Sequence, residues 1–134
     1  HRKLLRPRNR EPVPFLGVID IEEANRVRDL KTKRKAGSQG EADNSLQLTL
    51  YAVVTGKPDV AIDQLIKPTK TLPARYRRNL SSRTPEEMDH GLNIISDVAE
   101  GIAMGRFPLT MPDNWWCTVD WCPYWDRCRG KKLL

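Results

Sequence analysis

The sequence predicts an α/β or α+β domain in which a small mixed sheet is flanked by helices. The order of its apolar patterns supports this class: a predicted hairpin over 13–33, a helix over 42–55, a strand over 59–66 and a helix from Thr84. The chain has 134 residues, of which 39% are hydrophobic and 30% charged. This length and composition are typical of one globular domain with a single core.

The N-terminal third contains the predicted hairpin. Residues 1–12 are basic, contain two prolines and show no period, so we expect a basic arm or a truncated remnant there. Apolar residues from Phe15 to Ile21 and from Val27 to Leu30 predict two strands, and the polar residues 22–25 predict the turn between them. The small and polar residues 34–41 predict a flexible loop.

The remaining elements follow from helical and strand periodicity. Leucines and valines at spacings of three and four predict a helix from Ala42 to about Thr55, with Gly56 as its stop. Alternation over 59–66 predicts a third strand, whereas residues 67–83 predict only an extended or irregular segment. Thr84, followed by proline and then by Glu87, predicts a capped helix that ends at Gly105.

The charge of the chain favours a polyanionic partner. Its formal net charge is +6 at pH 7, and basic residues cluster after the Asp29-Leu30-Lys31 triplet and around residue 76. The candidates for phosphate-backbone contacts are Lys33, Arg34, Lys35, Arg75, Arg77 and Arg78. No apolar run reaches membrane-spanning length and no leader pattern is visible, so we expect a cytoplasmic protein without a membrane partner.

Two acids and a lysine converge on the predicted hairpin. Side chains alternate along a strand, so Asp29 and Lys31 share one face, and strand pairing would bring Asp20 within reach of them. Carboxylate oxygens, together with the backbone carbonyl of Leu30, are ligands that suit Mg²⁺ or Mn²⁺. Lys31 is placed to orient a water or to stabilise a developing anion. The pattern predicts metal-dependent hydrolysis of a phosphodiester.

Gln47 and Tyr51 lie four residues apart on the predicted helix and therefore share a face. Their amide and phenol can hydrogen-bond to a base edge, a phosphate or a metal-bound water. The alternative is an amphipathic helix whose tyrosine packs at the rim of the core.

All three cysteines of the chain, Cys117, Cys122 and Cys128, lie in one tryptophan-rich C-terminal segment. In a cytosolic protein this clustering favours a soft metal site, either a [4Fe–4S] cluster or Zn²⁺. Both normally take four ligands, and the fourth is left open between a residue upstream of residue 1, His1 or His90, and none. The alternative is an aromatic-rich plug with free cysteines.

Together these motifs resemble the PD-(D/E)XK nuclease superfamily, most closely its RecB-like exonuclease branch, over roughly residues 13–56 and 115–128. The resemblance implies a restriction-endonuclease-like core that acts on DNA. It matches Asp20 to the metal-binding aspartate of the second motif, Asp29 and Lys31 to the D-x-K motif, and Gln47 with Tyr51 to the Q-x-x-x-Y motif. The three cysteines look like the triplet that joins a distant N-terminal cysteine to hold an iron–sulfur cluster.

The family's upstream helix, which carries the histidine or glutamate of the first motif, has no counterpart here, nor has the N-terminal cluster cysteine. We therefore expect the C-terminal portion of such a nuclease. Its parts would be the arm or remnant over 1–12, a nuclease core over 13–114, and a Trp/Cys-rich segment of the same domain over 115–134.

The favoured function is a metal-dependent DNA exonuclease domain that acts in recombination, repair or phage replication, with other recombination or phage proteins as further partners. One alternative is a non-catalytic DNA-binding or assembly module that retains the nuclease fold. Another is a zinc-stabilised interaction domain.

Overall fold

The computed structural model describes residues 2–5, 13–108, 114 and 116–130. Contacts within the chain divide it into two compact units, His1–Glu100 and Gly101–Leu134. Within the described residues, the first unit contains every strand and most of the helical residues. The described part of the second unit contains the last residues of the helix Pro85–Ala103, then turns, bends and irregular segments, and one short π-helix, Asp126–Gly130. None of the helices in the described ranges has the length and apolar character needed to cross a bilayer.

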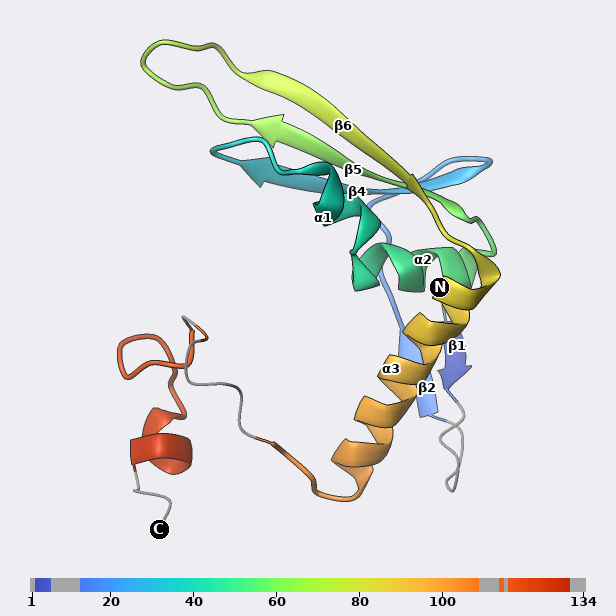
Figure 1. Ribbon diagram of the computed structural model, residues 1–134, viewed down its shortest axis with the longest axis vertical. Helices are drawn as coiled ribbons and strands as arrows, with labels where there is room; N and C mark the ends of the chain where they lie inside the picture. The colour runs from blue at the N-terminus through green and yellow to red at the C-terminus, as the bar shows by residue number, and fades with distance from the viewer. Residues whose placement is uncertain (1, 6–12, 109–113, 115, 131–134) are drawn as a thin grey trace. The chain divides into compact units, whose positions relative to one another are not determined.

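A four-stranded mixed sheet forms the centre of the first unit (Figure 1), with the strand order β3-β4-β5-β6. Its strands are β3 (Ile21–Glu22), β4 (Arg26–Lys33), β5 (Asp59–Ile66) and β6 (Arg75–Ser82). β4 and β5 are parallel, and the two outer pairs are antiparallel. β1 (Arg2–Leu5) and β2 (Val13–Leu16) pair separately. The predicted small mixed sheet with helices is confirmed.

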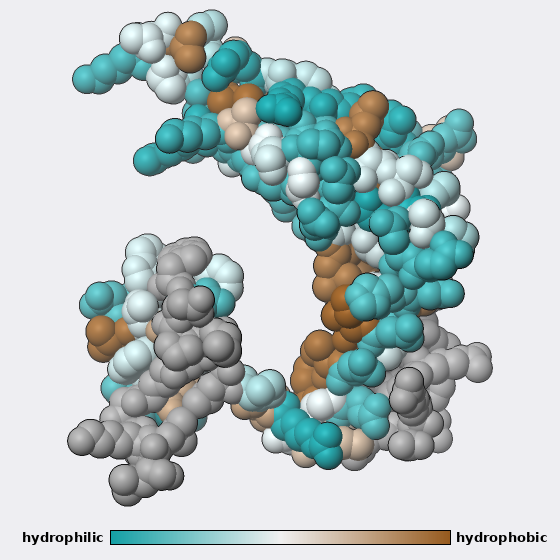
Figure 2. All heavy atoms as spheres, in the orientation of Figure 1, coloured by the Kyte–Doolittle hydropathy of each residue, from teal (hydrophilic) through white to brown (hydrophobic). Residues whose placement is uncertain are grey.

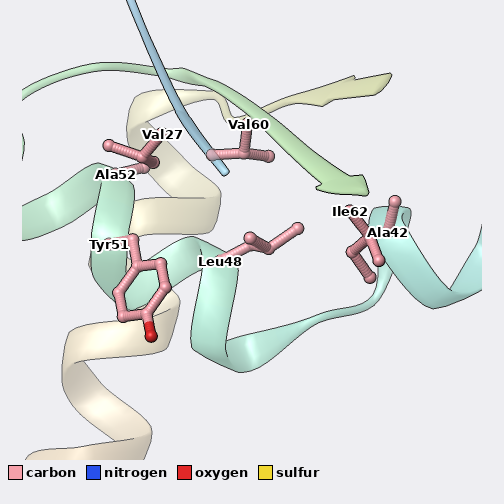
Figure 3. Close-up of a cluster of buried hydrophobic side chains, with 7 residues drawn as sticks. All are labelled: Val27, Ala42, Leu48, Tyr51, Ala52, Val60 and Ile62. Carbon is pink, nitrogen blue, oxygen red and sulfur yellow. The ribbon is translucent and has the colours of Figure 1, made fainter. Parts of the chain in front are cut away.

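The crossover between the parallel strands consists of α1 (Gln39–Asp43) and α2 (Leu46–Thr55), and it covers one face of the sheet, called here the front face. The core lies between them (Figure 3). It joins Val27, Val60 and Ile62 of the sheet to Leu48 and Ala52 of α2, each at most 5% exposed. Removal of this apolar surface from water is the main force that holds α2 on the sheet.

The long helix α3 (Pro85–Ala103) packs on α2 through Gly91. A Cβ at Gly91 would lie 2.7 Å from Cγ2 of Thr49, so only glycine permits this approach. The residue between β6 and α3, Arg83, is 4% exposed and donates to Thr49 Oγ1 at 2.8 Å and to the Ala42 carbonyl. Arg83 thereby ties the junction of α1 and α2 to the sheet.

Two sequence predictions are confirmed closely. The strand predicted over 59–66 is β5. At the start of α3, the Thr84 N–H donates to Glu87 Oε2 at 2.8 Å, and the Glu87 N–H donates to Thr84 Oγ1 at 3.2 Å. Gly105, just beyond the helix, has the left-handed φ of 68° that favours glycine.

The predicted hairpin over 13–33 is wrong in its first strand. β2 ends at Leu16 and pairs with β1, and residues 17–20 lie between strands, so the hairpin consists of β3 and β4 alone. Residues 17–20 are held by hydrogen bonds that involve side chains and not by backbone pairing with a neighbouring strand. Tyr51 Oη donates to the Val18 carbonyl, and the Leu30 N–H donates to the Asp20 carboxylate. Residues 2–5, predicted to belong to a basic arm or truncated remnant, form β1.

Two other boundaries differ from the sequence prediction. The helix predicted over 42–55 is two helices, because Ser45 accepts from the Leu48 N–H and starts α2 anew; α1 already begins at Gln39, inside the predicted loop. The segment 67–83, expected to be irregular, contains β6. Most residues of β6 are polar and exposed, so the strand lacks the apolar alternation on which strand prediction relies.

The opposite face of the sheet, called here the back face, is held by a buried acid. Asp63 of β5 is 2% exposed. It accepts from Arg78 Nε at 2.7 Å and Tyr76 Oη at 2.7 Å, and it pairs with Arg28. Burial alone would raise the pKa of Asp63, but the hydrogen bonds from Arg78, Tyr76 and Arg28 outweigh it and lower that pKa. One carboxylate therefore joins β4, β5 and β6.

We expect Asp63→Asn to lower the free energy of unfolding by about 2 kcal/mol, less than for a fully buried pair because Arg78 is partly exposed. In the unchanged chain, the Asp63 contribution is fully present above its unfolded-state pKa, near 4, and is lost as the pH falls through the lower folded-state pKa. Urea unfolding at neutral and acidic pH measures both effects. Glu41→Gln removes an exposed pair with Lys33 and is the control, with a change below about 1 kcal/mol. A similar loss in both variants would contradict this role of Asp63.

Candidate active site

Strand β4 presents Asp29 and Lys31 on the front face, as their spacing predicts. Asp29 is 2% exposed because α2 covers it, whereas Lys31 lies nearer the end of the strand and is half-buried. Lys31 Nζ lies 2.8 Å from Asp29 Oδ2. The acid and the lysine of the triplet therefore form an ion pair.

Asp20 reaches the same place from the segment before β3. Its Oδ2 accepts from the Leu30 N–H at 2.9 Å. The N–H and C=O of one strand residue point to the same edge of the strand, so the Leu30 carbonyl also faces the Asp20 side of β4. The structure thus brings Asp20, Asp29 and the Leu30 carbonyl to one edge of the sheet.

Helix α2 supplies Gln47 and Tyr51. Gln47 Nε2 donates to Asp29 Oδ1 at 3.0 Å and to Tyr51 Oη at 2.7 Å, and Gln47 Oε1 accepts from Lys31 Nζ at 3.3 Å. The Tyr51 ring packs in the core, its hydroxyl points away (Figure 3), and it donates to the Val18 carbonyl at 2.7 Å. These bonds join the five predicted side chains, Asp20 through the backbone of β4.

The electrostatics of the site keep Lys31 charged. The Asp29 carboxylate raises the pKa of Lys31, burial opposes this effect, and the charges of Asp29, Asp20 and Tyr51 add to it. Lys31 is therefore a cation at neutral pH. It can stabilise an anion or donate a hydrogen bond, but it does not act as a general base.

The acids also retain capacity to hold a cation. Asp29 Oδ2 is buried and accepts no aligned hydrogen bond from the described residues, so Lys31 is its only close counter-charge there. Asp20 is exposed. Two carboxylates and one carbonyl fit Mg²⁺ or Mn²⁺, which use oxygen ligands and retain waters. Within the described residues there is no group of three or more histidine, cysteine, aspartate or glutamate side chains that could hold a metal ion.

The predicted phosphate contacts divide into two groups. Lys33 pairs with Glu41, and Arg78 pairs with Asp63 on the back face. The other four candidates are exposed and make no ion pair or side-chain hydrogen bond with the described residues: Arg34, Lys35, Arg75 and Arg77. Only this second group is available to a ligand without the loss of an internal pair.

The three cysteines lie in the second unit, and each is partly buried. Cys117 lies in a bend, Cys122 lies between turns, and Cys128 is in the π-helix Asp126–Gly130. In the part of the chain that the structure describes, they are not gathered into a ligand group. The iron–sulfur or zinc site remains a prediction from their spacing.

Sequence reasoning missed two groups that support the site. Gln64, fully buried on β5, accepts from the Gly37 N–H at 2.6 Å and so fixes the loop after β4. Arg83 anchors the N-terminal end of α2, near Gln47. The adjacent polar residues Asp63 and Gln64 in an otherwise apolar strand were the signal available for Gln64. Arg83 gave no comparable signal, since it follows an arginine-rich segment.

Comparison with known proteins agrees with this geometry. The family model of the PD-(D/E)XK nuclease superfamily matches residues 11–129. This range includes Asp20, Asp29, Lys31, Gln47 and Tyr51, and the mixed sheet with its helices is consistent with a restriction-endonuclease-like fold. No curated protein and no solved structure matches the chain.

We expect the pKa of Lys31 to lie above its ordinary value near 10.4, and to return toward that value in Asp29→Asn. The stability gained from the pair is fully present below the unfolded-state pKa and is lost as the pH rises through the folded-state value. NMR titration of the lysine Nζ groups measures both forms. Asp89→Asn, a substitution of an exposed acid on α3, is the control. An unshifted Lys31 in the unchanged chain would contradict the ion pair.

Proposed function

Because the chain belongs to the PD-(D/E)XK nuclease superfamily, we propose that it is a Mg²⁺- or Mn²⁺-dependent deoxyribonuclease. One observation carries this proposal: Asp20, Asp29 and the Leu30 carbonyl meet at one edge of the sheet beside Lys31. Two acids, a carbonyl and a fixed cation are a set suited to the hydrolysis of a phosphodiester.

In this proposal Asp20, Asp29 and the Leu30 carbonyl hold the divalent cation. When bound, the cation would lower the pKa of a coordinated water and offset charge on the phosphate. The buried position of Asp29 fixes its carboxylate without rotamer freedom, and its Oδ1 is further oriented by Gln47 at 3.0 Å. Asp20 is exposed and held only through the Leu30 N–H, so it can adjust to the cation.

Lys31 would contact the phosphate or orient the attacking water. Its ammonium is paired with Asp29 Oδ2, an atom that the cation would also need. The two positive charges would repel at that oxygen, so a bound cation would favour Lys31 turned toward the substrate. The ion pair therefore keeps the lysine charged and close to the reacting group without fixing it there.

Gln47 and Tyr51 would steady the substrate strand and the acid. Gln47 touches Asp29, Lys31 and Tyr51, so its amide links the proposed metal ligand to the proposed phosphate contact. Tyr51 in turn is fixed by the Val18 carbonyl. The presence of this pair in the site supports assignment to the RecB-like branch, and with it exonuclease action in recombination, repair or phage replication.

The iron–sulfur cluster proposed for that branch rests on the spacing of Cys117, Cys122 and Cys128. The described residues do not assemble a ligand set around them. No step of the proposed reaction depends on these cysteines.

We expect the chain to cut end-labelled DNA with Mn²⁺ and not with EDTA. Lys31→Ala and Asp29→Asn should each lower the rate by at least about 100-fold, because each removes a charge aimed at the reacting group. Asp89→Asn, which lies outside the site, should retain the rate. The lengths of the labelled products show whether the chain acts as an exonuclease or as an endonuclease.

DNA binding without cutting in any of these proteins would instead favour a non-catalytic module that retains the fold. Equal cutting by the unchanged chain and by both site variants would contradict the assignment of the site.

A further inference from the structure

One end of the sheet concentrates positive charge that the candidate active site does not use. This basic end comprises the loop after β4, the loop between β5 and β6, and the start of β6 (Figure 1). Residues 67–78 contain five lysines and arginines and no acid. Figure 2 shows mostly hydrophilic and neutral residues over this end of the sheet. The exposed cations there that have no acidic partner among the described residues are Arg34, Lys35, Lys67, Lys70, Arg75 and Arg77.

The register of the sheet places these cations on the same face as the candidate site. In the strand register, Lys31 lies opposite Gln64, and Gln64 lies opposite Arg77. Two residues further along, Lys33 lies opposite Ile66, and Ile66 lies opposite Arg75. Residues paired directly across neighbouring strands share a face, and neighbouring strands lie about 4.8 Å apart. Arg77 therefore lies on the front face, two strands or about 10 Å from Lys31.

Three hydrogen bonds hold the intervening loop in place. The Gly37 N–H donates to Gln64 Oε1 at 2.6 Å, and Asn79 Nδ2 donates to the Ser38 carbonyl at 2.6 Å. Gln39 Nε2 donates to the Leu80 carbonyl at 2.6 Å. Gln64 and Asn79 are at most 1% exposed. The segment that carries Arg34 and Lys35 is thus anchored across the front face, between the site and β6, at little entropic cost to a ligand.

The cations of the two faces differ in their partners. On the back face, Arg28 pairs with Asp63 and Glu23, and Arg78 pairs with Asp63. On the front face at the basic end, only Lys33 has an acidic partner, Glu41, among the described residues. The unpaired charge of this end therefore lies on the front face and in the loops beside it.

We propose that the basic end is a second binding surface, which holds the sugar-phosphate backbone of the nucleic acid at a distance from the cut bond. This inference rests on the proposed function. It adds Lys67 and Lys70 to the predicted phosphate contacts and removes Arg78 from them. Continuity with the candidate site on one face favours a nucleic-acid strand over another polyanion. Cations without internal partners can neutralise phosphates and release counterions at no cost to the fold.

The test measures DNA affinity of the full chain as a function of KCl concentration, by fluorescence anisotropy in EDTA so that no cutting occurs. The logarithm of the affinity falls with the logarithm of the salt concentration, and the steepness of this fall is called the slope here. Each lost phosphate contact reduces the slope by about 0.7 for single strands and 0.9 for duplex. We expect the double variant Arg75→Gln/Arg77→Gln to lower the slope by about 1.4 to 1.8.

Two controls separate position from charge and from folding. Arg78→Gln removes one arginine charge from the back face and should leave the slope unchanged. Arg75→Lys/Arg77→Lys keeps both charges and should retain most of the slope of the unchanged chain. Far-UV circular dichroism shows whether each variant is folded.

A slope that falls only in the double glutamine variant supports the proposal. Equal slopes in the unchanged chain and that variant, a fall of about 0.7 to 0.9 in Arg78→Gln, or no DNA binding by the unchanged chain overturns it. A chain that cuts DNA but shows equal slopes retains the proposed nuclease function and loses only this second surface.

Discussion

The Asp29 carboxylate is the point on which the candidate site depends. It is 2% exposed, on a strand that also carries the core residue Val27. A buried carboxylate is costly unless other groups compensate its charge and hydrogen-bonding capacity. Lys31 and Gln47 supply this compensation incompletely, since Oδ2 keeps a lone pair without an aligned donor among the described residues. The incomplete compensation supports the proposal that this carboxylate holds a cation.

The two faces of the sheet differ in how their charged groups are paired. On the back face, Asp63 is fully satisfied by Arg28, Tyr76 and Arg78, and it fastens three strands together. On the front face, the core under α2 positions Gln47 and Tyr51 over β4, and at the basic end Arg75 and Arg77 have no acidic partner among the described residues. The back face thus joins three strands through one carboxylate, whereas the front face carries both the core and the proposed reactive and binding groups.

The sequence was sufficient for elements whose signal is local. The capping pair of Thr84 and Glu87 predicted the start of α3, and period-two alternation placed Asp29 and Lys31 on one face.

Prediction from the sequence failed where tertiary contacts replace local patterns. β6 has no apolar alternation because its residues face Asp63 on one side and a loop on the other. The residues after Leu16 leave the strand because their polar partners are Tyr51 and Leu30, distant in sequence. The family model matches the domain but assigns no role to these residues, so the roles in the site remain proposals.

The most direct measurement is Mn²⁺ binding, followed by the loss of the free-ion electron paramagnetic resonance signal in the unchanged chain, Asp29→Asn and Lys31→Ala. If Asp29 is a metal ligand and Lys31 competes for its Oδ2, the unchanged chain binds Mn²⁺, Asp29→Asn does not, and Lys31→Ala binds it more tightly. Equal binding by the unchanged chain and Asp29→Asn would contradict the account, as would weaker binding by Lys31→Ala.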